Sequence, residues 1–232
     1  MELDNLKALV EGSGMYPVFI GISGGTCSGK TFLASYLYHL LGGERVNIIS
    51  HDNYYKGWPN LSPEERTRIN FDHPEALDVA LLVEHLAALR RGKKVRIPVY
   101  DFKNHARIPE SREVVPKPFN IVEGILIFHE SGLRNALDLR VYLEVSFGTM
   151  LRRRLERDVR ERGRTVDFVR NQLFSTVYPM YMRFVEPYKR HAHLVIQEGT
   201  TLMERASLVI KAANMPVQEM ACIKPQTLGE KV

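Results

Sequence analysis

The chain has 232 residues, of which 44% are hydrophobic and 25% charged, and its formal net charge is +5. This composition is that of a globular protein and excludes global disorder, collagen and a coiled coil. The sequence has no run of roughly 18 apolar residues that could cross a bilayer. It has two cysteines and opens without the basic segment of a secretory signal. We therefore expect no disulfide framework, no membrane partner and a cytoplasmic location.

Short apolar segments alternate with amphipathic ones, which predicts strands alternating with helices. Strands are predicted at residues 18–22, 46–50, 139–145 and 194–197, and within residues 119–128. Helices are predicted at residues 30–41, 77–91, 147–161, 202–213 and 166–190, the last broken near Pro179 and Pro187. Extended pieces at residues 95–98 and 113–115 predict a hairpin off the main sheet. Because the strands read as buried on both faces, the pattern predicts an α/β fold with a parallel sheet flanked by helices.

A glycine-rich sequence stands between the first predicted strand and the first predicted helix. Residues 24–31, GGTCSGKT, fit the phosphate-loop pattern G-x-x-x-x-G-K-[ST]. Glycines let successive backbone N–H groups point at a triphosphate, and the helix adds its positive end. We expect Lys30 to reach the β- and γ-phosphates and Thr31 to offer its hydroxyl to Mg²⁺. The predicted ATP-binding residues of this loop are Gly24, Gly25, Thr26, Cys27, Ser28, Gly29, Lys30 and Thr31.

Two acidic residues come at the ends of predicted strands, where ligands bind in folds of this kind. Asp52 follows the second strand and can accept or orient the proton of an attacking hydroxyl. Glu123 ends an apolar run, where a carboxylate is costly unless it binds a metal or a strong donor, so we expect it to hold Mg²⁺ through water. The structural alternatives are a turn-capping aspartate and a hydrogen-bonded strand-end acid.

Arginines are concentrated in one segment, residues 151–165, which holds seven arginines against three acids. Phosphoryl transfer spreads negative charge over the γ-phosphoryl oxygens, and guanidinium groups can neutralise it. The candidates, which flank Gly163, are Arg154, Arg157, Arg162 and Arg164. The segment is predicted to be a lid that closes over the nucleotide, and the structural alternative is a solvated helix face.

These features in this order resemble the uridine kinase (uridine-cytidine kinase) family of P-loop nucleoside kinases, from about Val18 to Ala213. The segments that carry the resemblance are residues 21–31, 70–74 (NFDHP), 97–102 (IPVYDF), 105–107 (HAR), 123–126 (EGIL) and 153–158 (RRLERD). The resemblance implies one P-loop NTPase-type kinase domain at residues 17–214, with a small β-hairpin flap at about residues 93–118 and an arginine-rich helical lid at about residues 147–165. Residues 1–16 are expected to be a flexible leader and residues 215–232 a flexible tail.

The resemblance also implies roles for single residues. Asp52 is expected to be the base at the nucleoside 5′-hydroxyl, with Lys30, Arg157 and Arg162 as further catalytic residues and Arg154 near the ATP phosphates. Asp72 is expected to bind the ribose hydroxyls with help from Arg164. The remaining nucleoside-binding residues implied are Tyr100, Phe102, His105 and Gln172. The implied reaction is the transfer of the ATP γ-phosphoryl group, with Mg²⁺, to uridine or cytidine.

The sequence departs from the family pattern on the side of the donor base, at residues 191–193 (HAH) and at Thr200 and Thr201. It leaves open ATP or GTP as donor, uridine or cytidine as acceptor, and the oligomeric state, which includes a homo-oligomer. One alternative is a P-loop kinase of another small alcohol, similar to phosphoribulokinase, pantothenate kinase or nicotinamide riboside kinase. A phosphorylated acceptor would need a second basic cluster around Asp72 and Tyr100, and Arg66, Arg68 and Arg107 leave that open. The other alternative, suggested by the sequence pI of 9.2, is a non-catalytic nucleotide- or RNA-binding protein, which the grouping of arginines in one segment away from the aromatic residues disfavours.

Overall fold

The computed structural model describes residues 17–213, and their central element is a parallel sheet of five strands. Its order is β2-β5-β1-β6-β7, and every neighbouring pair is parallel. The strands are β1 (Val18–Gly24), β2 (Val46–Ser50), β5 (Phe119–Glu123), β6 (Leu139–Leu143) and β7 (Leu194–Ile196). All five predicted strands are therefore confirmed, each within a few residues of its predicted ends.

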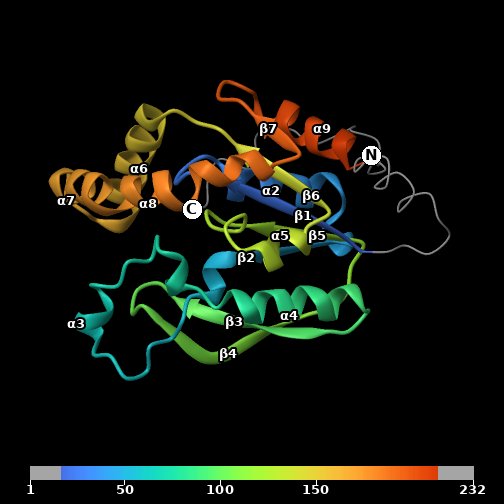
Figure 1. Ribbon diagram of the computed structural model, residues 1–232, viewed down its shortest axis with the longest axis horizontal. Coiled ribbons are helices and arrows are strands. Elements are labelled where there is room, and N and C mark those ends of the chain that lie inside the picture. The colour runs from blue at the N-terminus through green and yellow to red at the C-terminus, as the bar shows by residue number, and fades with distance from the viewer. Residues whose placement is uncertain (1–16, 214–232) are drawn as a thin grey trace.

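Alternating strand residues supply two separate cores, one on each face of the sheet. Along β1, Ile20 and Ile22 pack against α2 (Lys30–Leu40) and α9 (Leu202–Ala212). Phe19, which points to the other face, packs against α4 (Val79–Arg90) and its surroundings. Figure 1 shows these helices covering the sheet from opposite sides. Because both faces are covered, the strands are almost continuously apolar, as the sequence indicated.

A second, smaller sheet packs beside α4. It consists of β3 (Val95–Asp101) and β4 (Ala106–Val114), paired antiparallel, with an irregularity between Pro98 and Val99. The predicted hairpin is therefore present, and it is longer than its two predicted pieces. The chain reaches it from β2 through α3 (Pro63–Arg66) and α4. Asp78 caps α4 by accepting a hydrogen bond from the Leu81 N–H.

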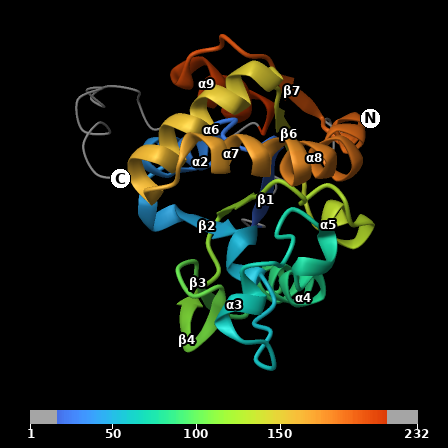
Figure 2. The same ribbon diagram turned by 90° about the vertical axis from the view of Figure 1, so that its left-hand side faces the viewer.

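Three consecutive helices follow β6 and gather at one end of the molecule. They are α6 (Phe147–Arg162), α7 (Val166–Gln172) and α8 (Tyr178–Phe184). Helix α6 ends at Gly163, whose φ of 62° lies in the left-handed region that glycine tolerates. Figures 1 and 2 show these helices across from α3 and the β3–β4 hairpin, at the same end of the molecule.

The prediction for residues 166–190 was correct in its helices and wrong about where the first break falls. A π-helical turn at Leu173–Val177 joins α7 to α8, and Pro179 lies in the first turn of α8. Proline has no N–H and crowds the preceding turn, so the widened turn before it accommodates the ring without ending the helix. The helical path ends instead at Phe184, before the 3₁₀ turn that contains Pro187.

Short helices complete the fold. Helix α5 (Ser131–Asn135) and the 3₁₀ turns were not predicted, because three to six residues are too few to show a periodicity. The 3₁₀ turns are Gly43–Arg45, His51–Tyr54, Pro74–Ala76 and Glu186–His191. The predicted leader and tail lie outside the described residues. Within residues 17–213, no helix is both long enough and apolar enough to span a bilayer.

Candidate active site

The phosphate loop lies at the carboxyl end of β1 and leads into α2. Three of its residues have positive φ angles: Gly24 (147°), Cys27 (55°) and Gly29 (97°). A side chain at Gly24 would place its Cβ 2.5 Å from the Leu143 carbonyl oxygen, so only glycine fits there. The loop therefore has the tight turn that the motif predicts, with the amino end of α2 directed into it.

Lys30 is the first residue of α2, and its side chain folds back over the loop. Its Nζ donates hydrogen bonds to the carbonyl oxygens of Gly24 (3.1 Å) and Gly25 (2.8 Å). Burial lowers the pKa of this ammonium group, while the nearby carboxylates of Glu123 and Asp52 act in the opposite direction. The ammonium group is thus held at the loop, with two carboxylates close by to balance its charge.

Glu123 occupies the carboxyl end of β5 and is 7% exposed. Parallel pairing places it beside Ser50 of β2, whose hydroxyl donates to Glu123 Oε1 at 2.7 Å. On the other side the Thr31 hydroxyl donates to Glu123 Oε2 at 3.4 Å. A carboxylate and a hydroxyl next to a phosphate loop are the oxygen ligands that Mg²⁺ takes in such sites, where phosphates supply further ligands.

The donor set around Glu123 is therefore chemically suited to Mg²⁺. Within residues 17–213 there is no group of three or more His, Cys, Asp or Glu side chains that could hold a metal by itself. A cation here would depend on Thr31, on Glu123 and on the phosphates of a nucleotide. This dependence is typical of Mg²⁺, which keeps several of its waters and uses few protein ligands.

Asp52 lies in the 3₁₀ turn that follows β2, and the structure brings it close to Lys30 and Glu123. Burial raises the pKa of its carboxyl group to about 6, and the Glu123 carboxylate adds to the increase. Lys30 and a hydrogen bond from Tyr55 act in the opposite direction. A carboxylate whose pKa lies near neutrality is suited to accept a proton from a hydroxyl.

Aromatic side chains from three segments surround the space next to Asp52. The Tyr100 ring of β3 lies 5.3 Å from the Tyr55 ring, and the Phe71 ring stacks on His105 at 4.8 Å. His105 is at the hairpin turn with a φ of 50°. The Tyr100 hydroxyl is buried and has no hydrogen-bond partner among the described residues. Phe102, in contrast, is 56% exposed at the end of the hairpin, with its ring 5.3 Å from that of Tyr100.

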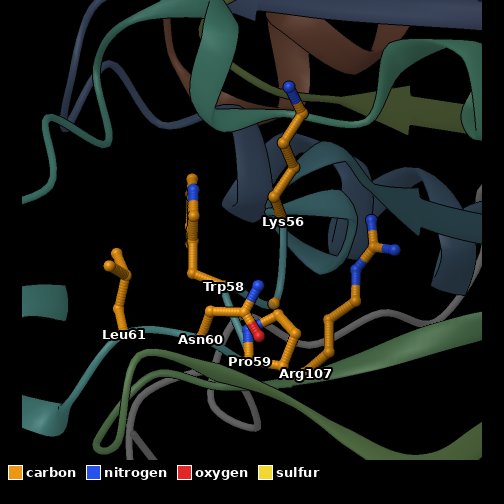
Figure 3. A pocket seen from close by; sticks show the side chains of 7 residues that line it. Lys56, Trp58, Pro59, Asn60, Leu61 and Arg107 are labelled. Carbon is orange, nitrogen blue, oxygen red and sulfur yellow. The ribbon is translucent and has the colours of Figure 1, made fainter.

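A cavity of about 510 Å³ opens beside these rings, under the loop that follows Tyr55. Trp58 and Leu61 line it from the loop, and Arg107 enters from β4 (Figure 3). The Trp58 ring also meets the edge of Phe71 at 5.9 Å. Arg107 is already occupied, because it donates to the Tyr54 and Tyr55 carbonyl oxygens and to Asp78.

Asp72 and Arg154 both lie near the phosphate loop. Burial raises the pKa of Asp72, while Arg154 and Lys30 lower it, so the aspartate is within electrostatic reach of both. Arg154 of α6 is 7% exposed, donates to the Thr26 hydroxyl at 3.0 Å and donates to Gln172 Oε1 at 3.0 Å. Gln172, expected at the nucleoside, thus has its amide oxygen bound to Arg154.

The four candidate arginines form one cluster, defined here as Arg154, Arg157, Arg162 and Arg164. All four lie within 3.6 Å of the carboxylate of Asp158. Arg164 also donates to Gln172 Oε1 at 3.2 Å, and together with burial its charge lowers the pKa of His105 on the hairpin. The hairpin and the arginine cluster therefore face the same space.

The structure thus brings the phosphate loop, Asp52, Glu123, Asp72 and the arginine cluster to one end of the sheet, next to the aromatic hairpin. Sequence reasoning assigned no role to Ser50, Tyr55 or Asp158. Ser50 could have been found from the parallel register, since it ends the strand next to that of Glu123. Asp158 stands four residues after Arg154, a spacing that pairs charges on a helix. Tyr55 leaves no such signal in the sequence.

A phosphate loop at the carboxyl end of a five-stranded parallel sheet, with arginines on a facing helix, defines the class of P-loop kinases. Residues 19–203 match the phosphoribulokinase / uridine kinase family. This match covers most of the chain, which therefore belongs to that family.

Individual relatives agree with this assignment. The chain is 45% identical over 183 residues to a uridine kinase of Brevibacillus brevis, covering 79% of this chain and 86% of that protein. It is 42% identical over 205 residues to a uridine kinase of Chloroflexus aggregans, covering 88% of this chain and 98% of that protein. The phosphoribulokinase of Rhodobacter spheroides has the same fold, with a TM-score of 0.58 and 13% identity, over 79% of this chain and 71% of that one.

Proposed function

We propose that the chain transfers the γ-phosphoryl group of ATP to the 5′-hydroxyl of uridine or cytidine, which gives UMP or CMP in pyrimidine salvage. The single observation that carries the proposal is the meeting of Asp52 with the phosphate-loop Lys30 beside the aromatic hairpin. That arrangement supports a reaction in which a base, a bound triphosphate and a flat ring lie next to one another. Relatives named uridine kinase, at 42–45% identity over most of the chain, support the same acceptor.

Phosphoryl transfer of this kind needs positioning and charge stabilisation more than covalent chemistry from the protein. Asp52 accepts a hydrogen bond from the 5′-hydroxyl, orients it for in-line attack and takes its proton as the new bond forms. Lys30 and the loop N–H groups hold the β- and γ-phosphates. The arginine cluster faces the transferring group and stabilises the charge on its oxygens.

Thr31 and, through water, Glu123 would hold Mg²⁺, which supplies neutralisation of the charge shared by the β- and γ-phosphates. Ser50 fixes the Glu123 carboxylate from the other side. On the acceptor side, Asp72 can receive hydrogen bonds from both ribose hydroxyls, and Arg164 assists it. Tyr100 and His105 contact the edge of the pyrimidine, while Phe102 and Gln172 complete the nucleoside site.

The proposal also includes two segments that close over the substrates, a flap and a lid. We assign residues 17–214 to one kinase unit, with the hairpin at about residues 93–118 as a flap and residues 147–165 as the lid. Closure of the lid arginines over the nucleotide would exclude water and suppress wasteful hydrolysis. A cytoplasmic location, the choice of ATP over GTP and the formation of a homo-oligomer stay predictions for direct measurement.

A phosphorylated acceptor is disfavoured by one specific contact. Arg107, one of the arginines near the aromatic rings, is neutralised by Asp78 at 3.2 Å and bound to two backbone carbonyl oxygens. Its guanidinium group therefore has few N–H donors left to bind a second phosphate. A nucleic-acid function is disfavoured because the arginines gather on one carboxylate in place of lining a groove with interleaved aromatic residues.

The test is a coupled assay of ADP release with magnesium-ATP and a panel of acceptors. The panel holds uridine, cytidine, 2′,3′-dideoxyuridine, D-glycerate and ribulose 5-phosphate. We expect turnover with uridine and cytidine, and little with the dideoxynucleoside, which lacks the hydroxyls for Asp72. Turnover with D-glycerate or the sugar phosphate alone would overturn the assignment, and so would steeply salt-dependent RNA binding without any nucleoside-dependent turnover.

A further inference from the structure

Asp158 is a buried acidic residue surrounded by arginines. No step of the proposed reaction uses it. It lies in the last two turns of α6 and is 0% exposed. A fully buried carboxylate is costly unless it is paired and hydrogen-bonded. The partners of its carboxylate therefore indicate the role of Asp158.

The two carboxylate oxygens divide the arginine cluster between them. Oδ1 accepts from Arg157 Nε at 2.8 Å and lies 3.5 Å from Arg162 Nη1. Oδ2 accepts from Arg164 Nη1 at 3.3 Å and lies 3.6 Å from Arg154 Nε. One side chain thus sets the position of guanidinium groups that come from three turns of helix and the loop after it.

The backbone of the same residue fixes that loop. The Asp158 carbonyl oxygen accepts the N–H of Gly163, the residue that ends α6, and the N–H of Arg164 at 3.0 Å. The turn that carries Arg162 and Arg164 is therefore attached to Asp158 through both the main chain and the side chain. A shift of this residue would move both arginines together.

Charge explains why an acid is needed there. Four guanidinium groups gathered without a counter-charge would repel one another and swing towards water. One carboxylate reduces the charge of the cluster from four to three and still leaves it strongly positive towards a phosphoryl group. Gln172 is neutral and contacts only Arg154 and Arg164, so it cannot replace the carboxylate.

We propose that Asp158 is a positioning residue of the kinase reaction: it holds the four lid arginines in the arrangement that faces the transferring phosphoryl group. It touches neither nucleotide nor acceptor, and it acts through the arginines. This inference rests on the proposed function, since it assumes that these arginines stabilise a phosphoryl transfer.

The test compares three variants with the parent: Asp158→Asn, Asp158→Glu and Asp158→Gln. Loss of one partner from a buried charge network costs several kcal/mol in other proteins, so we expect kcat of Asp158→Asn to fall by at least about 30-fold. KM for uridine should stay within about threefold, because the acceptor site is untouched. Binding of inorganic tripolyphosphate, measured by calorimetry, should be unchanged or tighter, because the site loses a negative charge.

The pair Asp158→Glu and Asp158→Gln separates the effect of charge from the effect of packing. The same pair tests the inference if Asp158→Asn does not fold. Glu and Gln are equal in size, so we expect Asp158→Glu to retain about tenfold more turnover than Asp158→Gln at a similar Tm. The matched control is Glu156→Gln, an exposed acid on the same helix, which should behave as the parent does.

Equal turnover in Asp158→Glu and Asp158→Gln would overturn the inference, because packing alone would then explain the residue. Parent-like kcat in Asp158→Asn, or loss of tripolyphosphate binding in step with kcat, would do the same. Failure of the proposed function is distinguishable from these results. In that case the parent itself would show no uridine-dependent turnover, while its tripolyphosphate binding would persist.

Discussion

Asp52 illustrates how a proposed catalytic side chain can conflict with the stability of the fold. Burial and the neighbouring Glu123 raise the pKa of its carboxyl group to about 6 from an ordinary value of 3.8. At neutral pH the folded protein therefore carries a carboxylate that the unfolded chain would carry more easily in water. The proposed base is thus obtained at some cost in stability, as is common at active sites.

Replacing Asp52 by Asn should remove turnover and stabilise the protein. Without nucleotide and metal, we expect the Tm of Asp52→Asn at pH 7.5 to exceed that of the parent by roughly 2–6 °C. A folded-state pKa above the unfolded value means that the penalty is full above about pH 6 and absent below about pH 4. The advantage of the variant should therefore disappear in scans at pH 4. A lower Tm for the variant at pH 7.5 would contradict this account of Asp52.

Asp72 is expected to act on binding and not on the chemical step. Removing an acceptor that serves two ribose hydroxyls in Asp72→Ala should raise KM for uridine by roughly 10–100-fold, with a smaller effect on kcat. Steady-state kinetics at saturating ATP measure both quantities. A fall in kcat with KM unchanged would instead place Asp72 at the reacting group.

At the scale of elements, the β3–β4 hairpin contains a buried polar atom that contributes no hydrogen bond to the fold. The Tyr100 hydroxyl is buried and unpaired among the described residues, and burial raises its pKa to about 12. A buried hydroxyl without a partner costs about 1–3 kcal/mol, so the fold does not explain it. A nucleoside edge would supply the missing partner.

Tyr100→Phe separates these two effects. The variant should unfold at the same temperature as the parent or higher, and KM for uridine should rise by about 3–10-fold. Differential scanning fluorimetry and initial rates check the two parts. An unchanged KM would remove the hydroxyl from the nucleoside site.

The end of helix α6 gives a prediction about backbone strain. Gly163 has a φ of 62°, and an added Cβ would meet nothing within 4 Å, so Gly163→Ala adds backbone strain alone. We expect a loss of about 1 kcal/mol in the free energy of unfolding, measured by urea denaturation. The control is Gly132→Ala in α5, which has the same open space and no positive φ, and which should be neutral or stabilising.

Elements differed in how far the sequence predicted them. The strands and the phosphate loop were predicted well, because buried apolar runs and the glycine pattern are local signals. The π-helical turn before Pro179 and the 3₁₀ turn that contains Asp52 were not predicted, because their conformations depend on how the neighbouring segments pack and not on a local pattern. Contacts such as the four arginines on Asp158 depend on how α6 ends and on where Arg164 then turns, which spacing alone does not determine.

At the scale of the whole molecule, part of the surplus of positive charge is concentrated at one end of the sheet. The arginine cluster carries four positive charges against one acid, and Lys30 adds another beside Glu123 and Asp52. These charges lie at the carboxyl end of the sheet, and α6, which carries three of the four arginines, lies across from the β3–β4 hairpin (Figure 2). The arginine cluster and Asp158 together carry a net charge of three, so a large part of the chain's net charge of +5 is gathered at this one place.

The most direct measurement follows a labelled γ-phosphoryl group from magnesium-ATP in the presence of uridine. The account predicts that the label appears on the 5′-oxygen of the nucleoside, identified by phosphorus NMR, and that Asp52→Asn abolishes this transfer while ATP still binds. Label found only in inorganic phosphate, or attached to a different alcohol in a mixture of acceptors, would contradict it.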